Sequence, residues 1–165
     1  MSPTFEHENY IGFISDIGRI LSEEMGLVVE AAGATTYKQE SLLKGSEGDE
    51  SFYVKNASAI IGKRRIDLDV DPPPDVVVEV DITNESLAKF PIYAAFLVPE
   101  IWRYDGKQAR IYHLVNQSYL ERDASLSFRF LTAQAMTEFL EQSKTQGQTA
   151  ALAAFRQWVR AAIQV

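Results

Sequence analysis

The segment from Pro72 to Asp81 (PPPDVVVEVD) constrains the fold more than any other part of the chain. Its three prolines disfavour a helix at the start, and the four valines after them are β-branched residues typical of an interior strand. Carboxylates interrupt this apolar run, because Asp75 opens it, Glu79 lies within it and Asp81 closes it. Side chains alternate along a strand, so we expect these three carboxylates to share one face with Val77.

Three carboxylates on one face of an apolar strand repel one another and resist desolvation. A divalent cation or a basic side chain is therefore expected to compensate their charge. Two of the carboxylates also have a plainer interpretation, since Asp81 could be a solvated residue at the strand end and Asp75 could cap the turn after the prolines. Glu79 is the hardest to explain this way. A functional site and a structural ion pair remain equal alternatives from this segment alone.

Composition narrows the classes of protein that this chain can belong to. The chain has 165 residues, 46% of them hydrophobic, which suits one domain with a core of its own. It has no cysteine, which excludes disulfides, a thiol nucleophile and thiolate-bound metals. No stretch resembles a signal peptide or a membrane span, so we predict a cytoplasmic protein without a membrane partner. The net charge of -7 argues against a broad nucleic-acid surface but not against a local basic patch or a metal-bridged phosphate.

The hydrophobic pattern predicts a single α+β domain over residues 1–165. Helices are expected at 10–25, from Thr83 or Asn84 to about Val98 with a kink or division at Pro91, at 132–143, and from Thr149 onward. Strands are expected at 27–32 and 35–38 (separately or as one hairpin), 51–54, 75–82, 101–104, 110–115, 119–122 and 128–131, with a polar turn at 45–50. Strand, helix and strand over 76–104 imply one parallel crossover, and the rest implies antiparallel pairing. The predicted architecture is a mixed sheet flanked by helices.

Four charged residues follow one another in a suggestive order. Asp49 stands at the start of the predicted strand 51–54, and Asp75 and Glu79 belong to the next acidic strand. Lys89 follows on the crossover helix, four residues before Tyr93 and hence on the same helix face.

This order resembles the PD-(D/E)xK nuclease fold, and more closely the Uma-two family of restriction-endonuclease-like proteins, which is abundant in cyanobacteria. The resemblance spans most of the chain, and the combination of segments is specific although each segment alone is weak. The segments that carry it are Met1–Pro3 with Glu6–Glu8, Glu47–Tyr53, Pro72–Thr83, Lys89–Tyr93 and Val98–Gly106.

The resemblance implies Mg²⁺- or Mn²⁺-dependent hydrolysis of phosphodiester bonds in DNA by a restriction-endonuclease-like domain. It assigns Asp49 and Glu79 as metal ligands, Asp75 as a third ligand, and Lys89 as the base that faces the water or the phosphate. These residue types suit the chemistry, because hard divalent cations prefer oxygen ligands and lower the pKa of a bound water. A lysine nearby stabilises charge that develops at phosphorus. A homodimer would bring two such sites together for double-strand cleavage.

The chain departs from the family pattern in three places. Asp81 occupies the position two residues after Glu79, where the superfamily usually has its lysine, so Lys89 must act from the helix. Gly48 replaces the proline expected before Asp49. Related proteins begin with further residues, so we expect an N-terminal edge element to be missing. These departures keep a second hypothesis open, a catalytically inactive nuclease-fold protein that serves as a binding or assembly module.

Other catalytic classes find little support. The two histidines, His7 and His113, lie far apart in sequence and are interpreted as a surface and a sheet residue rather than as a pair of ligands. The chain has no Gly-x-Ser-x-Gly motif and no phosphate-binding glycine loop, which argues against a serine hydrolase and a P-loop enzyme.

Overall fold

The computed structural model describes residues 3–164 and begins with the long helix α1 (Phe5–Met25). This helix starts earlier than its hydrophobic stripe predicts, because the side chain of Thr4 caps it by accepting a hydrogen bond from the backbone N–H of His7. It ends where predicted, at Gly26, whose φ of 64° is in the left-handed region that glycine tolerates. Met1 and Ser2, which contributed to the family resemblance, lie outside the described residues.

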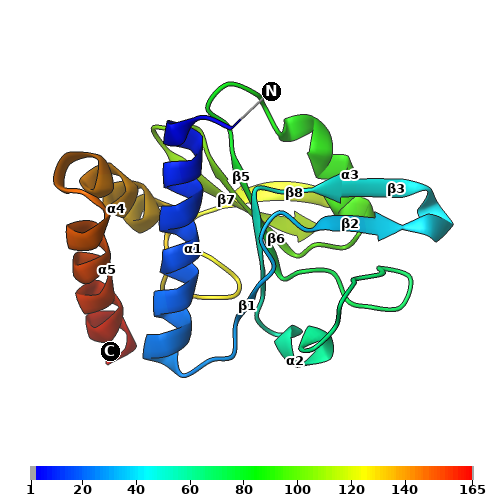
Figure 1. Ribbon diagram of the computed structural model, residues 1–165, viewed down its shortest axis with the longest axis horizontal. Helices are drawn as coiled ribbons and strands as arrows, with labels where there is room; N and C mark the ends of the chain where they lie inside the picture. The colour runs from blue at the N-terminus through cyan, green and yellow to red at the C-terminus, as the bar shows by residue number, and fades with distance from the viewer. Residues whose placement is uncertain (1–2, 165) are drawn as a thin grey trace.

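A six-stranded mixed sheet forms the centre of the molecule, as predicted (Figure 1). Strands β5 and β6 are parallel and every other neighbouring pair is antiparallel, so the sheet contains the predicted crossover. In spatial order the strands are β1 (Glu30–Ala31), β4 (Glu50–Tyr53), β5 (Val76–Val80), β6 (Glu100–Tyr104), β7 (Ala109–Val115) and β8 (Ser118–Arg122).

The two faces of the sheet are covered differently. Helices α1, α4 (Ala133–Gln146) and α5 (Gln148–Ile163) cover one face, whereas the short helix α3 (Phe90–Ala95) lies on the other (Figure 1). Strand β5 alternates between them as predicted, because Val76, Val78 and Val80 join the core under α1 and α5. Val77 packs instead with Tyr93 of α3. Glu79 therefore lies on the α3 face. Among residues 3–164, no helix combines the length and the apolar character that crossing a bilayer requires.

The crossover from β5 to β6 is divided near Pro91, as predicted. A 3-10 turn, η2 (Leu87–Lys89), precedes α3, and Pro91 lies in the first turn of α3, where its missing N–H costs nothing. The predicted cap is wrong, since Ser86 and not Thr83 or Asn84 precedes η2. The last helix begins at Gln148, one residue before the predicted Thr149.

Three segments differ from the sequence-based expectation. The predicted polar turn at 45–50 overlaps strand β3 (Lys44–Glu47). This strand pairs with β2 (Thr36–Gln39) in a separate two-stranded sheet, and a 3-10 turn (η1, Glu40–Leu42) links the two strands. The two-stranded sheet projects from the side of the molecule (Figure 1). The loop after β4 contains a short helix, α2 (Ala57–Ile60). Residues 128–131 form a turn rather than a strand, although Phe128 and Leu131 are fully buried.

Candidate active site

A close approach of two chain segments places Asp49 beside β5. The backbone N–H of Asp49 donates to the carbonyl oxygen of Val78 at 2.9 Å, and its carboxylate Oδ2 accepts from the N–H of Val80 at 2.7 Å. Gly48 makes this approach possible. A Cβ at Gly48 would lie 2.7 Å from Cγ1 of Val77 and 3.1 Å from the carbonyl oxygen of Val78. The position where the family pattern expects a proline therefore has no room for a side chain in this chain, because Val77 and the backbone of Val78 lie too close.

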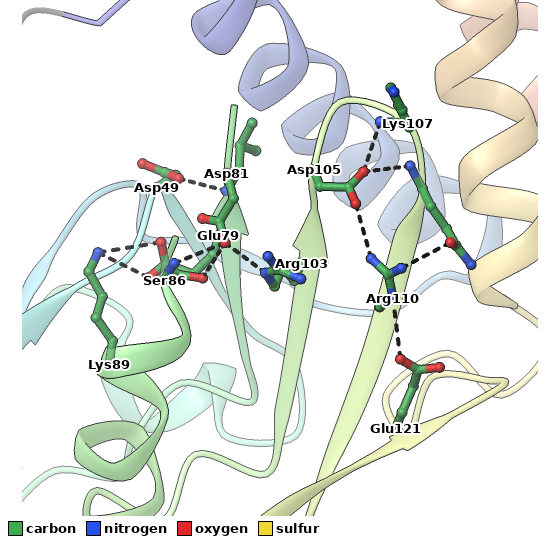
Figure 2. A network of polar contacts seen from close by, with 12 residues as sticks. Asp49, Glu79, Asp81, Ser86, Lys89, Arg103, Asp105, Lys107, Arg110 and Glu121 are labelled. Atoms are coloured by element: carbon green, nitrogen blue, oxygen red, sulfur yellow. Dashed lines mark hydrogen bonds and ion pairs between the residues drawn. The ribbon is translucent and has the colours of Figure 1, made fainter. Parts of the chain in front are cut away.

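Glu79 is almost completely buried and has two donors from the crossover. The hydroxyl of Tyr93 donates to Oε1 at 2.5 Å. Nζ of Lys89 lies 3.2 Å from Oε1 and 3.4 Å from Oε2 (Figure 2). Lys89 also donates to the carbonyl oxygen of Glu47 at 3.0 Å. Lys89 and Tyr93 thus reach the same carboxylate, as their spacing on one helix face predicts.

Burial controls the ionisation of Glu79. Its side chain is 3% exposed, and desolvation raises its pKa from 4.5 to about 7. The hydrogen bond from Tyr93 and the charge of Lys89 act in the opposite direction, while the charge of Asp49 adds to the rise. Burial and the neighbouring carboxylate also raise the pKa of the Tyr93 hydroxyl. A divalent cation here would favour the ionised carboxylate and offset the cost of its burial.

An open cavity of about 160 Å³ gives access to this carboxylate pair. Asp49, Glu79 and Lys89 line it together with His7 and the segment 80–86. The structure therefore brings three of the four residues that the sequence singled out into one site.

Asp81 is a buried anchor at the edge of this cavity rather than a solvated strand end. Its Oδ2 accepts hydrogen bonds from the N–H and the hydroxyl of Ser86, both at 2.9 Å, and from Nε of Arg103 at 2.7 Å (Figure 2). Ser86 in turn accepts the backbone hydrogen bond from Lys89 at 2.8 Å. Asp81 thus holds the segment that delivers Lys89.

Asp75 lies away from the other candidates, at the opposite end of β5. Its Oδ2 accepts hydrogen bonds from the backbone N–H groups of Val54 and Asn56 at 2.6 and 3.1 Å. Four residues of strand separate Asp75 from Glu79, which corresponds to roughly 13 Å. The shared face predicted from alternation is not enough to bring the two together, and Asp75 serves as the cap of a turn.

His7, which the sequence analysis interprets as a surface residue without a role in the site, also lines this cavity. It comes from the first turn of α1, and its Nε2 lies 3.4 Å from Oδ2 of Asp49. The Glu6–Glu8 segment contributes to the family resemblance, but the resemblance assigns no role to any residue in it. The sequence alone gave no reason to bring this segment next to Asp49, because the contact depends on how α1 packs across the sheet.

The donor set suits a hard divalent cation bound by few protein ligands. Among residues 3–164, no group of three or more Asp, Glu or His side chains is arranged to hold a metal ion. Asp49 and Glu79 nevertheless supply two carboxylates, and Oδ1 of Asp49 makes no hydrogen bond within the described chain. Mg²⁺ usually keeps several waters and binds through one or two carboxylates together with substrate phosphates. Two carboxylates in an open cavity fit that mode.

Comparisons with known proteins identify the fold and the family of the chain. No curated protein matches the chain. A solved structure described as a "putative nuclease belonging to DUF820 from Anabaena variabilis" matches with a TM-score of 0.58 and 14% sequence identity, over 85% of this chain and 84% of that one, which shows a shared fold. The family model Uma2, described as "Putative restriction endonuclease", matches residues 1–146. Because this match covers most of the sequence, the chain belongs to the Uma2 family of restriction-endonuclease-like proteins.

Proposed function

We propose that this protein is a Mg²⁺- or Mn²⁺-dependent endonuclease that hydrolyses phosphodiester bonds in DNA. The main support is the buried carboxylate of Glu79, which faces an open cavity beside Asp49 and carries Lys89 on both of its oxygens. Perturbed carboxylates of this kind cluster at active sites. The descriptions of the family and of the structural neighbour point to the same class of enzyme.

Asp49 and Glu79 are the residues that would hold the cation. When bound, the cation polarises the phosphate and lowers the pKa of the attacking water. The backbone N–H of Val80 orients Asp49 by donating to Oδ2, and Oδ1 makes no hydrogen bond within residues 3–164. Tyr93 fixes Glu79 in the same way through Oε1.

Lys89 is suited to hold the attacking water or to offset charge at the phosphate. Its ammonium group is placed by two acceptors, the carboxylate of Glu79 and the carbonyl oxygen of Glu47. The side chain is 40% exposed, so the ammonium group is also accessible to a molecule in the cavity. Asp81 occupies the usual position of the lysine but is committed to Ser86. The crossover therefore supplies the cationic group.

Calorimetric titration with Mn²⁺ tests the metal site directly. We expect saturable binding in the wild type and its loss in Glu79→Gln, while Glu121→Gln, which changes an exposed glutamate on β8, binds normally. A wild type that binds no Mn²⁺, either alone or with duplex DNA, would contradict the proposal.

Cleavage of supercoiled plasmid tests the activity. We expect Mn²⁺- or Mg²⁺-dependent nicking or linearisation that EDTA abolishes. Lys89→Met should lose cleavage but keep Mn²⁺ binding, because Lys89 contributes to the reaction and not to the ligand set. Full activity in both Lys89→Met and Glu79→Gln would rule out the assigned site.

One observation favours the second hypothesis, a non-catalytic binding module. Lys89 and Tyr93 already satisfy the carboxylate of Glu79 without a metal ion. In that case Glu79 and Lys89 would form a structural ion pair. DNA binding without cleavage in any divalent cation, with no measurable Mn²⁺ affinity, is the result that this alternative predicts.

A further inference from the structure

We propose that His7 is a further substrate-binding residue of this site, which donates a hydrogen bond from Nε2 to a phosphate oxygen of the DNA. The inference rests on the proposed nuclease function and names the group that recognises the phosphate beside Asp49. It adds an element, the first turn of α1, to a site otherwise built from the sheet and the crossover.

The position of His7 is well defined by local contacts. Its backbone N–H donates to the side chain of Thr4 at 3.1 Å, which anchors the first turn of the helix. The imidazole is only 22% exposed and lines the cavity. Nε2 lies 3.4 Å from Oδ2 of Asp49, yet within residues 3–164 it makes no hydrogen bond. The nitrogen is therefore close to the candidate metal ligand and still available to a molecule in the cavity.

The surroundings of the ring favour a donor over a metal ligand. Nδ1 lies 3.3 Å from a carboxylate oxygen of Glu8, and Nε2 faces a carboxylate oxygen of Asp49. Carboxylates accept hydrogen bonds and cannot donate them, so the oxygen of Asp49 favours the tautomer that carries its proton on Nε2. A metal ligand needs a free lone pair on nitrogen, which this arrangement disfavours. A phosphate oxygen is an acceptor and suits it.

Charge in the cavity points to the same ligand. Among the residues that line it, Lys89 and His7 have the two basic side chains, whereas Asp49, Glu79, Asp81 and Glu85 are acidic. Each of the two candidate metal ligands has one of these nitrogen groups beside it, Lys89 at Glu79 and His7 at Asp49. Once a cation neutralises the carboxylates, both nitrogen groups can turn to the anionic oxygens of a phosphodiester.

The histidine content of the chain allows a direct spectroscopic test. The chain has two histidines, and His113 on β7 pairs with Glu100, which in turn pairs with Val76 at the far end of β5 from Glu79. In the NMR spectrum of histidine-labelled protein, we expect duplex DNA added with Ca²⁺ to shift the ring signals of His7 and leave those of His113 in place. Bound DNA, detected by fluorescence anisotropy, with no change at His7 would overturn the inference.

Variants separate phosphate binding from metal binding. We expect His7→Ala to weaken the binding of a duplex oligonucleotide in Ca²⁺ by roughly tenfold or more, the usual effect of losing a hydrogen bond to a charged group. The affinity for Mn²⁺ should change less than about twofold, since one hydrogen-bond donor is removed and no ligand is lost. His7→Gln should recover part of the DNA affinity, because its amide can also donate. His113→Gln is the control.

The outcomes distinguish this inference from the proposed function. If His7→Ala loses Mn²⁺ binding as completely as Asp49→Asn does, His7 is a metal ligand and the phosphate role is wrong. If Mn²⁺ binding and cleavage persist while His7→Ala binds DNA normally, the nuclease stands and the inference falls. Circular dichroism checks that His7→Ala remains folded.

Discussion

Replacing Glu79 with glutamine should remove a pH-dependent loss of stability from the metal-free protein. The pKa of Glu79 is raised from 4.5 to about 7 in the folded state, so the folded protein binds a proton here more tightly than the unfolded chain does. The resulting stabilisation is fully present below pH 4.5 and is lost as the pH rises through 7. Glutamine cannot ionise, and it can still accept hydrogen bonds from Tyr93 and Lys89.

The size of the effect follows from the pKa shift. The rise from 4.5 to about 7 amounts to about 3 kcal/mol of unfolding free energy, at about 1.4 kcal/mol for each pKa unit. Because Glu79 is 2% exposed, solvent screens this contribution little. Relative to the wild type, Glu79→Gln should therefore gain about 3 kcal/mol in unfolding free energy between pH 4 and pH 8.

Urea denaturation with EDTA present measures this difference. Fluorescence of the buried Trp102 reports unfolding, and the difference between the two proteins cancels the contributions of all other titrating groups. Glu121→Gln, an exposed change, should follow the wild type at both pH values. Mn²⁺ at pH 8 should stabilise the wild type and leave Glu79→Gln unchanged. Parallel pH dependence in wild type and Glu79→Gln would refute the argument that burial controls this carboxyl.

Two further substitutions test how the site is built. Gly48→Ala should destabilise the protein by about 1 to 3 kcal/mol in chemical denaturation, because its Cβ would lie 2.7 Å from Cγ1 of Val77. The same substitution should weaken Mn²⁺ binding by displacing Asp49. Asp75→Ala should lower the stability by about 1 to 3 kcal/mol, since two backbone N–H groups lose their acceptor, while the affinity for Mn²⁺ measured by calorimetry stays unchanged. A loss of Mn²⁺ binding in Asp75→Ala at unchanged stability would return Asp75 to the ligand set.

The central strand and its crossover could be predicted because local and long-range requirements agree there. Val76 to Val80 are all buried, and a strand buried on both faces reads as an apolar run in sequence. The carboxylate of Glu79 could be identified for the same reason, since it interrupts that run. Pro91 divides the crossover where its chemistry predicts.

The incorrect predictions arise where tertiary contacts determine the structure. The apolar segment 128–131 suggests a strand, but Phe128 and Leu131 are buried in a turn. In that turn the backbone N–H of Leu131 donates to the carbonyl oxygen of Phe128. Strand β3 is polar because it belongs to a small sheet outside the core, so its pattern indicates a turn.

The site shows the same division between local and long-range information. Alternation places Asp75 and Glu79 on one face, but only the register of β4 against β5, in which Glu50 pairs with Val78, decides that Asp49 arrives beside Glu79. Register is a tertiary property, and so is the packing of α1 that brings His7 to Asp49.

The presence of Asp81 at the usual lysine position explains how the segment that carries Lys89 is held in place. Asp81 follows Glu79 by two residues and would place another negative charge next to the cavity. Arg103 offsets that charge, and the two hydrogen bonds from Ser86 to the same oxygen fix the segment that leads to Lys89. Asp81, which occupies the position where the superfamily usually has its lysine, therefore helps to position Lys89 in the crossover. Because the carboxylate anchors that segment and the lysine depends on it, exchanging Asp81 for lysine alone would remove the anchor without reproducing the placement of Lys89.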